Sequence, residues 1–108
     1  MTLDAFVFES DSLREAAIAS IRLGDAETLA HINNEIRQQG SARNFPIILN
    51  TVLKDARQNG GEIAHPSIPS LVAELEKIKT EDKRLNRFKT DLLEISRVAY
   101  AAERPIVF

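Results

Sequence analysis

The stretch that decides the fold is residues 68–103, IPSLVAELEKIKTEDKRLNRFKTDLLEISRVAYAAE. Apolar residues recur in it every seven positions, and these are Leu71, Ile78, Leu85, Leu92 and Ala99. Further apolar residues line the same side, namely Leu75 in the first half and Phe88, Ile95 and Ala102 in the second. This spacing predicts a helix with one apolar seam. Pro105 ends it, because proline cannot continue a helix.

The same stretch can form one helix or two. A straight helix of 36 residues would be ~54 Å long, whereas a compact chain of this size has a radius of gyration near ~13 Å. Thr80, followed by Glu81 and Asp82, could cap a new helix and break the stretch. The unbroken seven-residue register favours a continuous, bent helix. We therefore expect a long C-terminal helix whose seam the small body does not cover completely.

Helix start and stop signals divide the chain before residue 60. Ser12, with a glutamate three residues later, predicts a helix over 12–23 that Gly24 ends. Asp25 predicts the start of the next helix, which Gly40 closes. Because almost no residues separate these two helices, the sequence predicts a tight N-terminal αα-hairpin.

A third helix is expected to begin around Asn44 and Pro46, since proline is well tolerated in a first turn. It carries apolar residues on more than one face, so we expect it to be buried. It ends before Gly60, where a loop of residues 60–70 begins.

Both chain ends carry a short apolar run, residues 5–8 and residues 105–108. These runs could pair as short terminal strands, but a two-stranded ladder is marginal unless it packs on helices. Hydrophobic flaps over a helical bundle are the favoured interpretation. The predicted fold is therefore a single all-α domain, residues 1–108, of four to five helices.

Composition excludes several function classes. The chain of 108 residues has 44% hydrophobic and 28% charged residues and a formal charge of -2, so no overall basic balance predicts a polyanion partner. It has no cysteine, which removes thiol chemistry and Cys-ligated zinc. We expect no secretory signal, no membrane span and a cytoplasmic location, because no long apolar stretch occurs.

The strongest candidate for metal chemistry is the set Glu27, His31 and Glu35, which are spaced by four and so share one helix face. This face lies opposite the apolar stripe of the helix, and a solvated surface is the favoured interpretation. A phosphoacceptor role for His31 is disfavoured, because the segment that resembles the sensor-kinase box has Asn34 in place of the histidine. No enzyme motif is present, so we expect no catalytic residue, no metal and no cofactor.

Two binding functions remain. The favoured hypothesis is a small non-catalytic interaction protein, of adaptor or inhibitor type, that binds a protein partner and could form a homodimer. Its contact surface is expected along the end of the seam and at the C-terminus, that is, at Phe88, Leu92, Ile95, Tyr100 and Phe108.

The alternative is a nucleic-acid-binding or transcription-regulating module. It would use the basic stripe at residues 77–89, in particular Lys79, Lys83, Arg84 and Arg87. Acidic residues share that side and can pair with these bases. A solvated helix face is therefore favoured over a phosphate track.

Overall fold

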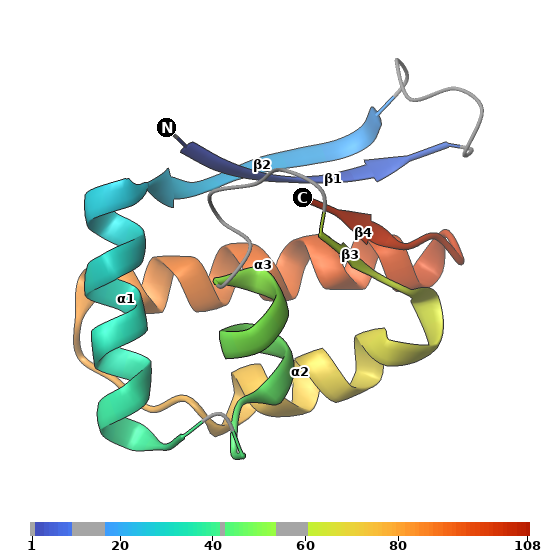
Figure 1. Ribbon diagram of the computed structural model, residues 1–108. Helices are drawn as coiled ribbons and strands as arrows, with labels where there is room; N and C mark the ends of the chain where they lie inside the picture. The colour runs from blue at the N-terminus through green and yellow to red at the C-terminus, as the bar shows by residue number, and fades with distance from the viewer. Residues whose placement is uncertain (1, 10–16, 42, 54–60) are drawn as a thin grey trace.

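The computed structural model describes residues 2–9, 17–41, 43–53 and 61–108, and it shows an α+β fold. A four-stranded antiparallel sheet has the strand order β2-β1-β4-β3. The strands are β1 (Thr2–Phe8), β2 (Ala17–Asp25), β3 (Glu62–Ile63) and β4 (Ile106–Val107). The helices of the described residues all lie on one side of this sheet (Figure 1). The prediction of an all-α helical bundle is wrong.

The prediction of an N-terminal αα-hairpin is wrong, because its first expected helix is replaced by a strand. Residues 17–23 of the expected helix 12–23 belong to β2, which pairs with β1 along its length, and residues 12–16 lie outside the described residues. No helical hairpin forms here, because β2 leads directly into one helix. Gly24 makes this junction with a φ of +152°, and a Cβ there would lie 3.0 Å from Thr28 Cγ2. Only glycine fits this conformation without strain.

The helix predicted after Asp25 is confirmed as α1 (Ala26–Gln39). The Asp25 carboxylate accepts a hydrogen bond from the Thr28 N–H at 2.8 Å, as an N-cap does. The Gly40 N–H donates to the Ile36 carbonyl at 3.1 Å and closes the helix. The buried side of α1 consists of Leu29, Ile32 and Ile36.

A short helical segment follows at Pro46, as expected, and continues as a π-helical turn, Ile48–Val52. Ile48 and Val52 are fully buried. The end that we predicted for this helix falls in residues 54–60, outside the described residues.

The prediction of one long C-terminal helix is wrong. Residues 68–103 form two antiparallel helices instead, α2 (Ile68–Lys77) and α3 (Lys83–Ala101) (Figure 1). Ile78 leaves the helix with a ψ of 121° and is fully buried. Lys89 Nζ donates to the Ile78 carbonyl at 2.8 Å and so binds the end of α2 to α3. Asp82 caps α3 by accepting from the Leu85 N–H at 2.9 Å. The break therefore comes near Thr80, as the disfavoured alternative required.

The interpretation of the two terminal apolar runs as hydrophobic flaps is also wrong, because both runs contribute strands to the sheet. Phe6 of β1 pairs with Val107 of β4, and β4 pairs with β3. The Phe108 N–H donates to the Gly61 carbonyl at 2.9 Å, which extends the ladder. The helices supply the packing that such short strands need.

The core lies between the sheet and the helices. The β1 residues Leu3, Ala5 and Val7 are fully buried and face the helices, while Asp4, Phe6 and Phe8 alternate with them on the other face. The molecule measures 39 × 28 × 21 Å. Among the described residues, no helix is both long and apolar enough to cross a bilayer.

Candidate functional site

Four of the five predicted contact residues lie in the core of this chain. The exposed fractions are 1% for Phe88, 0% for Leu92, 3% for Ile95 and 7% for Phe108. α3 turns back along α2, so its seam packs against its own chain. A side chain that is this buried cannot touch a partner while the protein stays folded, and the expected seam surface is therefore not available.

Tyr100 is the exception, with an exposed fraction of 52%. Its ring stacks on His65 with the centroids 4.9 Å apart and an interplanar angle of 18°. Tyr100 thus packs on the short helical turn before α2, and one face of its ring contacts His65.

The four basic residues Lys79, Lys83, Arg84 and Arg87 are all exposed. They do not form a stripe along one helix, because Lys79 lies in the turn between α2 and α3 while the other three lie at the start of α3. Arg87 Nε lies 3.7 Å from Asp91 Oδ2, one helical turn further on. The regular spacing that suggested a phosphate track is therefore lost at the helix break.

The outer face of the sheet is the surface that sequence reasoning missed. Opposed residues of antiparallel strands point to the same face, and the observed pairs are Asp4–Arg22, Phe6–Ser20 and Phe6–Val107. We call this surface the outer sheet face, and it consists of Asp4, Phe6, Phe8, Ile18, Ser20, Arg22 and Val107. Its members are half-buried or exposed. None of the described helices covers it (Figure 1).

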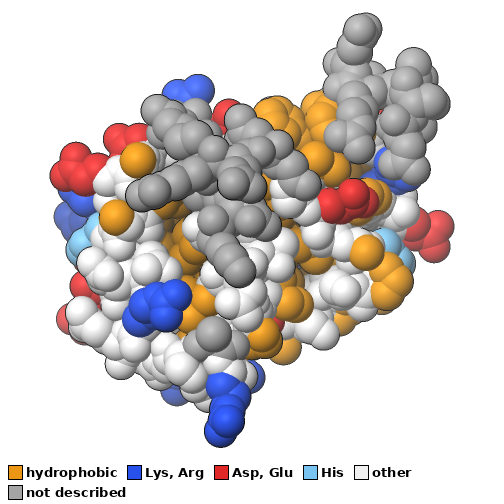
Figure 2. All heavy atoms as spheres, viewed as in Figure 1, with side chains coloured by type: hydrophobic (Ala, Val, Ile, Leu, Met, Phe, Trp, Pro, Cys, Tyr) orange, Lys and Arg blue, Asp and Glu red, His pale blue; other side chains and the backbone are white. Residues whose placement is uncertain are grey.

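The outer sheet face is apolar around a small charged centre. The rings of Phe6 and Phe8 stack with their centroids 5.6 Å apart. Ile18, an extra residue at an irregularity in the β1–β2 pairing, is 50% exposed. In Figure 2, hydrophobic side chains reach the surface at the top of the view, where β1 and β2 lie. A group of neighbouring apolar side chains at the surface is typical of a site that binds another protein.

The charged centre of the outer sheet face is the pair Asp4 and Arg22. The Arg22 Nε lies 3.5 Å from Asp4 Oδ1, and the side chains are 72% and 34% exposed, respectively. Asp4, Phe6, Ser20 and Arg22, together with Ile21, line a shallow hollow of about 370 Å³. A hollow this open has no enclosed volume for a small molecule, but it can receive a side chain of another protein.

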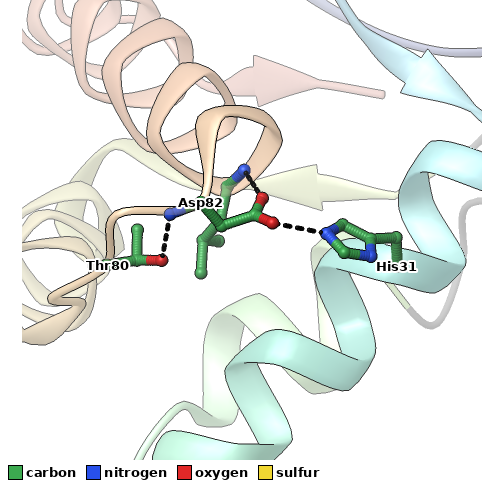
Figure 3. A network of polar contacts seen from close by, with 4 residues as sticks. His31, Thr80 and Asp82 are labelled. Carbon is green, nitrogen blue, oxygen red and sulfur yellow. Dashed lines mark hydrogen bonds and ion pairs between the residues drawn. The ribbon is translucent and has the colours of Figure 1, made fainter.

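A second polar site joins α1 to the start of α3. His31 Nε2 lies 2.8 Å from Asp82 Oδ2 (Figure 3). The Leu85 N–H that bonds to the carboxylate, and next the hydrogen bond with His31, lower the pKa of Asp82 below its ordinary value. Glu35, one helical turn after His31, contributes a third potential ligand atom. Of the predicted set, Glu27 is not part of this cluster, and Asp82 takes its place.

Comparisons with protein family models, with curated proteins and with solved structures gave no match. The functional proposals therefore rest on the geometry of the outer sheet face and of the polar site around His31 and Asp82.

Proposed function

We propose that this chain is a small non-catalytic interaction protein that works through its outer sheet face and docks a second copy of itself there. The observation that carries the proposal is the stacked pair Phe6 and Phe8, together with half-exposed Ile18, on a sheet face that no described element covers. The sequence contains no enzyme motif, and an exposed apolar patch is typical of a surface that binds another protein.

Charge complementarity favours a second copy as the occupant. The outer sheet face carries one acid, Asp4, beside one base, Arg22. A two-fold axis through this centre would place each Arg22 opposite the Asp4 of the other copy, and the phenyl rings would meet across the axis. Such an arrangement is self-complementary, as a two-fold interface must be. The formal charge of -2 adds little repulsion between copies.

The size of the outer sheet face predicts a weak dimer. β1 and β2 have seven and nine residues, and at ~3.3 Å per residue and ~4.8 Å per strand the face is roughly 250 Å² in projection. A standard interface takes about 800 Å² from each partner. The face provides about a third of that area, so we expect dissociation in the micromolar range or weaker, with rapid exchange.

Analytical ultracentrifugation of the full chain from ~10 µM to ~1 mM tests this proposal. The wild-type mass should rise towards that of a dimer with concentration. Ile18→Arg places a charge on the outer sheet face, and Phe6→Thr removes one ring while keeping a residue that favours strands. Both variants should remain monomeric.

Val98→Arg is the matched control, because Val98 is also a β-branched, surface-exposed residue but lies on α3. It should dimerise as the wild type does. A wild-type chain that stays monomeric at ~1 mM contradicts self-association. Equal dimerisation of all variants would place the interface elsewhere.

A further inference from the structure

We propose that His31, Glu35 and Asp82 bind a divalent transition-metal ion, such as Zn²⁺, between α1 and the start of α3. One ligand atom from each residue lies within 4.8 Å of the other two. His31 and Glu35 are four residues apart on α1, so they share one face of the helix. Asp82 comes from a segment 51 residues away from His31 in sequence.

The donor set suits such an ion in type and charge. An imidazole nitrogen and two carboxylate oxygens are ordinary zinc ligands, and three protein ligands leave room for water as a fourth. The two carboxylates together carry two negative charges, which a divalent ion neutralises. An imidazole ligand favours zinc and its neighbours over magnesium or calcium, which prefer all-oxygen sites.

The distances need only side-chain adjustment. Ligand atoms around a tetrahedral zinc ion, at ~2.0–2.2 Å from it, are about 3.3 Å apart. The 2.8 Å contact between His31 and Asp82 must therefore open by roughly 0.5 Å, as the ion takes the place of the shared proton. Glu35 must approach by up to about 1.5 Å, which the free rotation of its side chain permits.

The surroundings already orient the Asp82 carboxylate. The carboxylate Oδ1 accepts a hydrogen bond from the Leu85 N–H at 2.9 Å. The backbone N–H of Asp82 donates to Thr80 Oγ1 at 3.0 Å. These bonds leave Oδ2 directed at His31 (Figure 3). Hydrogen bonds that orient a ligand in this way are a regular feature of metal sites.

A structural ion pair between His31 and Asp82 does not explain why the Glu35 carboxylate lies beside them. The Glu35 side chain is half-buried near the Asp82 carboxylate, and within the described ranges it has no hydrogen bond or ion pair. The cluster places two carboxylates, with two formal negative charges, beside one imidazole. A bound divalent cation neutralises these charges and gives Glu35 a partner, which is the specific reason to infer a site here.

Calorimetric titration of the full chain with Zn²⁺, supported by the visible absorption of Co²⁺, tests the proposal. We expect one ion per chain and a rise in thermal midpoint that chelation reverses. Asp82→Asn keeps the helix cap, because asparagine caps as well as aspartate does, but it loses the anionic ligand. Glu35→Gln keeps the shape and loses the charge. Each should weaken binding by about tenfold or more.

Glu27→Gln is the control, because it makes the same charge change as Glu35→Gln about two turns earlier on α1, and Glu27 is not in the cluster. It should bind within about twofold of the wild type, and circular dichroism checks that all variants are folded. The proposal is overturned if wild-type protein shows no saturable binding below ~1 mM. It is also overturned if Asp82→Asn and Glu35→Gln bind as tightly as Glu27→Gln does.

Discussion

Glu74 is the buried charged side chain whose removal should test the packing of the fold most directly. It lies on α2 and is 5% exposed. Its Oε1 accepts from the Ile47 N–H at 3.0 Å and from the Ile48 N–H at 3.1 Å, and its Oε2 lies 3.1 Å from the Ile47 nitrogen. The first amides of a helix have no partner within the helix. Pro46 has no N–H, so Glu74 covers the two amides that follow it.

Glu74→Ala leaves these two amides without their acceptor. An unsatisfied buried donor costs about 1–3 kcal/mol. The Ile48 amide is buried, whereas water can reach the partly buried Ile47 amide. We therefore expect a loss of about 2–4 kcal/mol in the free energy of unfolding, measured by urea denaturation at neutral pH with helical circular dichroism as the signal.

One further variant, Glu74→Gln, separates hydrogen bonding from charge. Burial raises the pKa of the Glu74 carboxyl, and the two amide bonds only partly oppose this effect. Stability linked to a raised pKa is present below the unfolded pKa and is lost as pH rises through the folded pKa. Glu74→Gln keeps an acceptor without the charge, so its stability relative to wild type should increase from pH ~4 to pH ~7.

Glu76→Ala is the control on the same helix, because Glu76 is exposed, and it should change stability by less than about 0.5 kcal/mol. The reasoning fails if Glu74→Ala costs no more than Glu76→Ala. It also fails if Glu74→Gln loses stability relative to wild type as pH rises.

Two other predictions concern the junction between β2 and α1. Gly24→Ala places a Cβ 3.0 Å from Thr28 at a φ of +152°, and it should lower the free energy of unfolding by about 1–3 kcal/mol; an unchanged urea midpoint would contradict this. The Thr28 N–H lowers the pKa of Asp25, so stability linked to this carboxyl is present above its unfolded pKa and is lost as pH falls through the folded pKa. Asp25→Asn keeps the cap, and its urea midpoint should fall less than that of the wild type between pH ~5 and ~2. Parallel acid profiles for the two proteins would refute this.

The sequence predicts α1 well because its signals are local. Asp25 and Gly40 act on amides and carbonyls within four residues, and the structure shows both contacts. Capping chemistry of this kind depends little on the rest of the fold. It locates the two ends of α1, but it does not report what precedes the helix.

β1 was missed because it does not alternate in polarity. β2 does alternate, with polar Ser20 and Arg22 between apolar residues, and it was missed because the capping signal at Ser12 favoured a helix. The inward residues of β1 are apolar, but two of its three outward residues are Phe6 and Phe8. Alternation is the signal by which a half-buried strand is recognised, and in β1 the two phenylalanines interrupt it. The same property that hid the strand makes the outer sheet face a binding surface. β3 and β4 are two residues each and have no periodicity to detect.

The helix break shows why periodicity misleads about both the fold and the site. Two helices that pack on one core each need an apolar face, and Ile78 in the turn is itself fully buried. A seven-residue register can therefore cross the turn without interruption, so only capping chemistry and size distinguish a hairpin from a rod. Helices of ten and 19 residues are ~15 and ~29 Å long, and both fit within the 39 Å length of the molecule.

The same break creates the proposed metal site. The residue that ends the turn, Asp82, uses one carboxylate oxygen to cap α3, and its other oxygen then faces His31. In a continuous helix the backbone would have bonded the Leu85 amide internally, and Asp82 would lie on a solvated helical surface away from α1. The contact depends on a chain reversal 51 residues from His31, so no local motif on α1 could have revealed it. The capping signal at Thr80–Asp82 is the feature from which both the fold and this site follow.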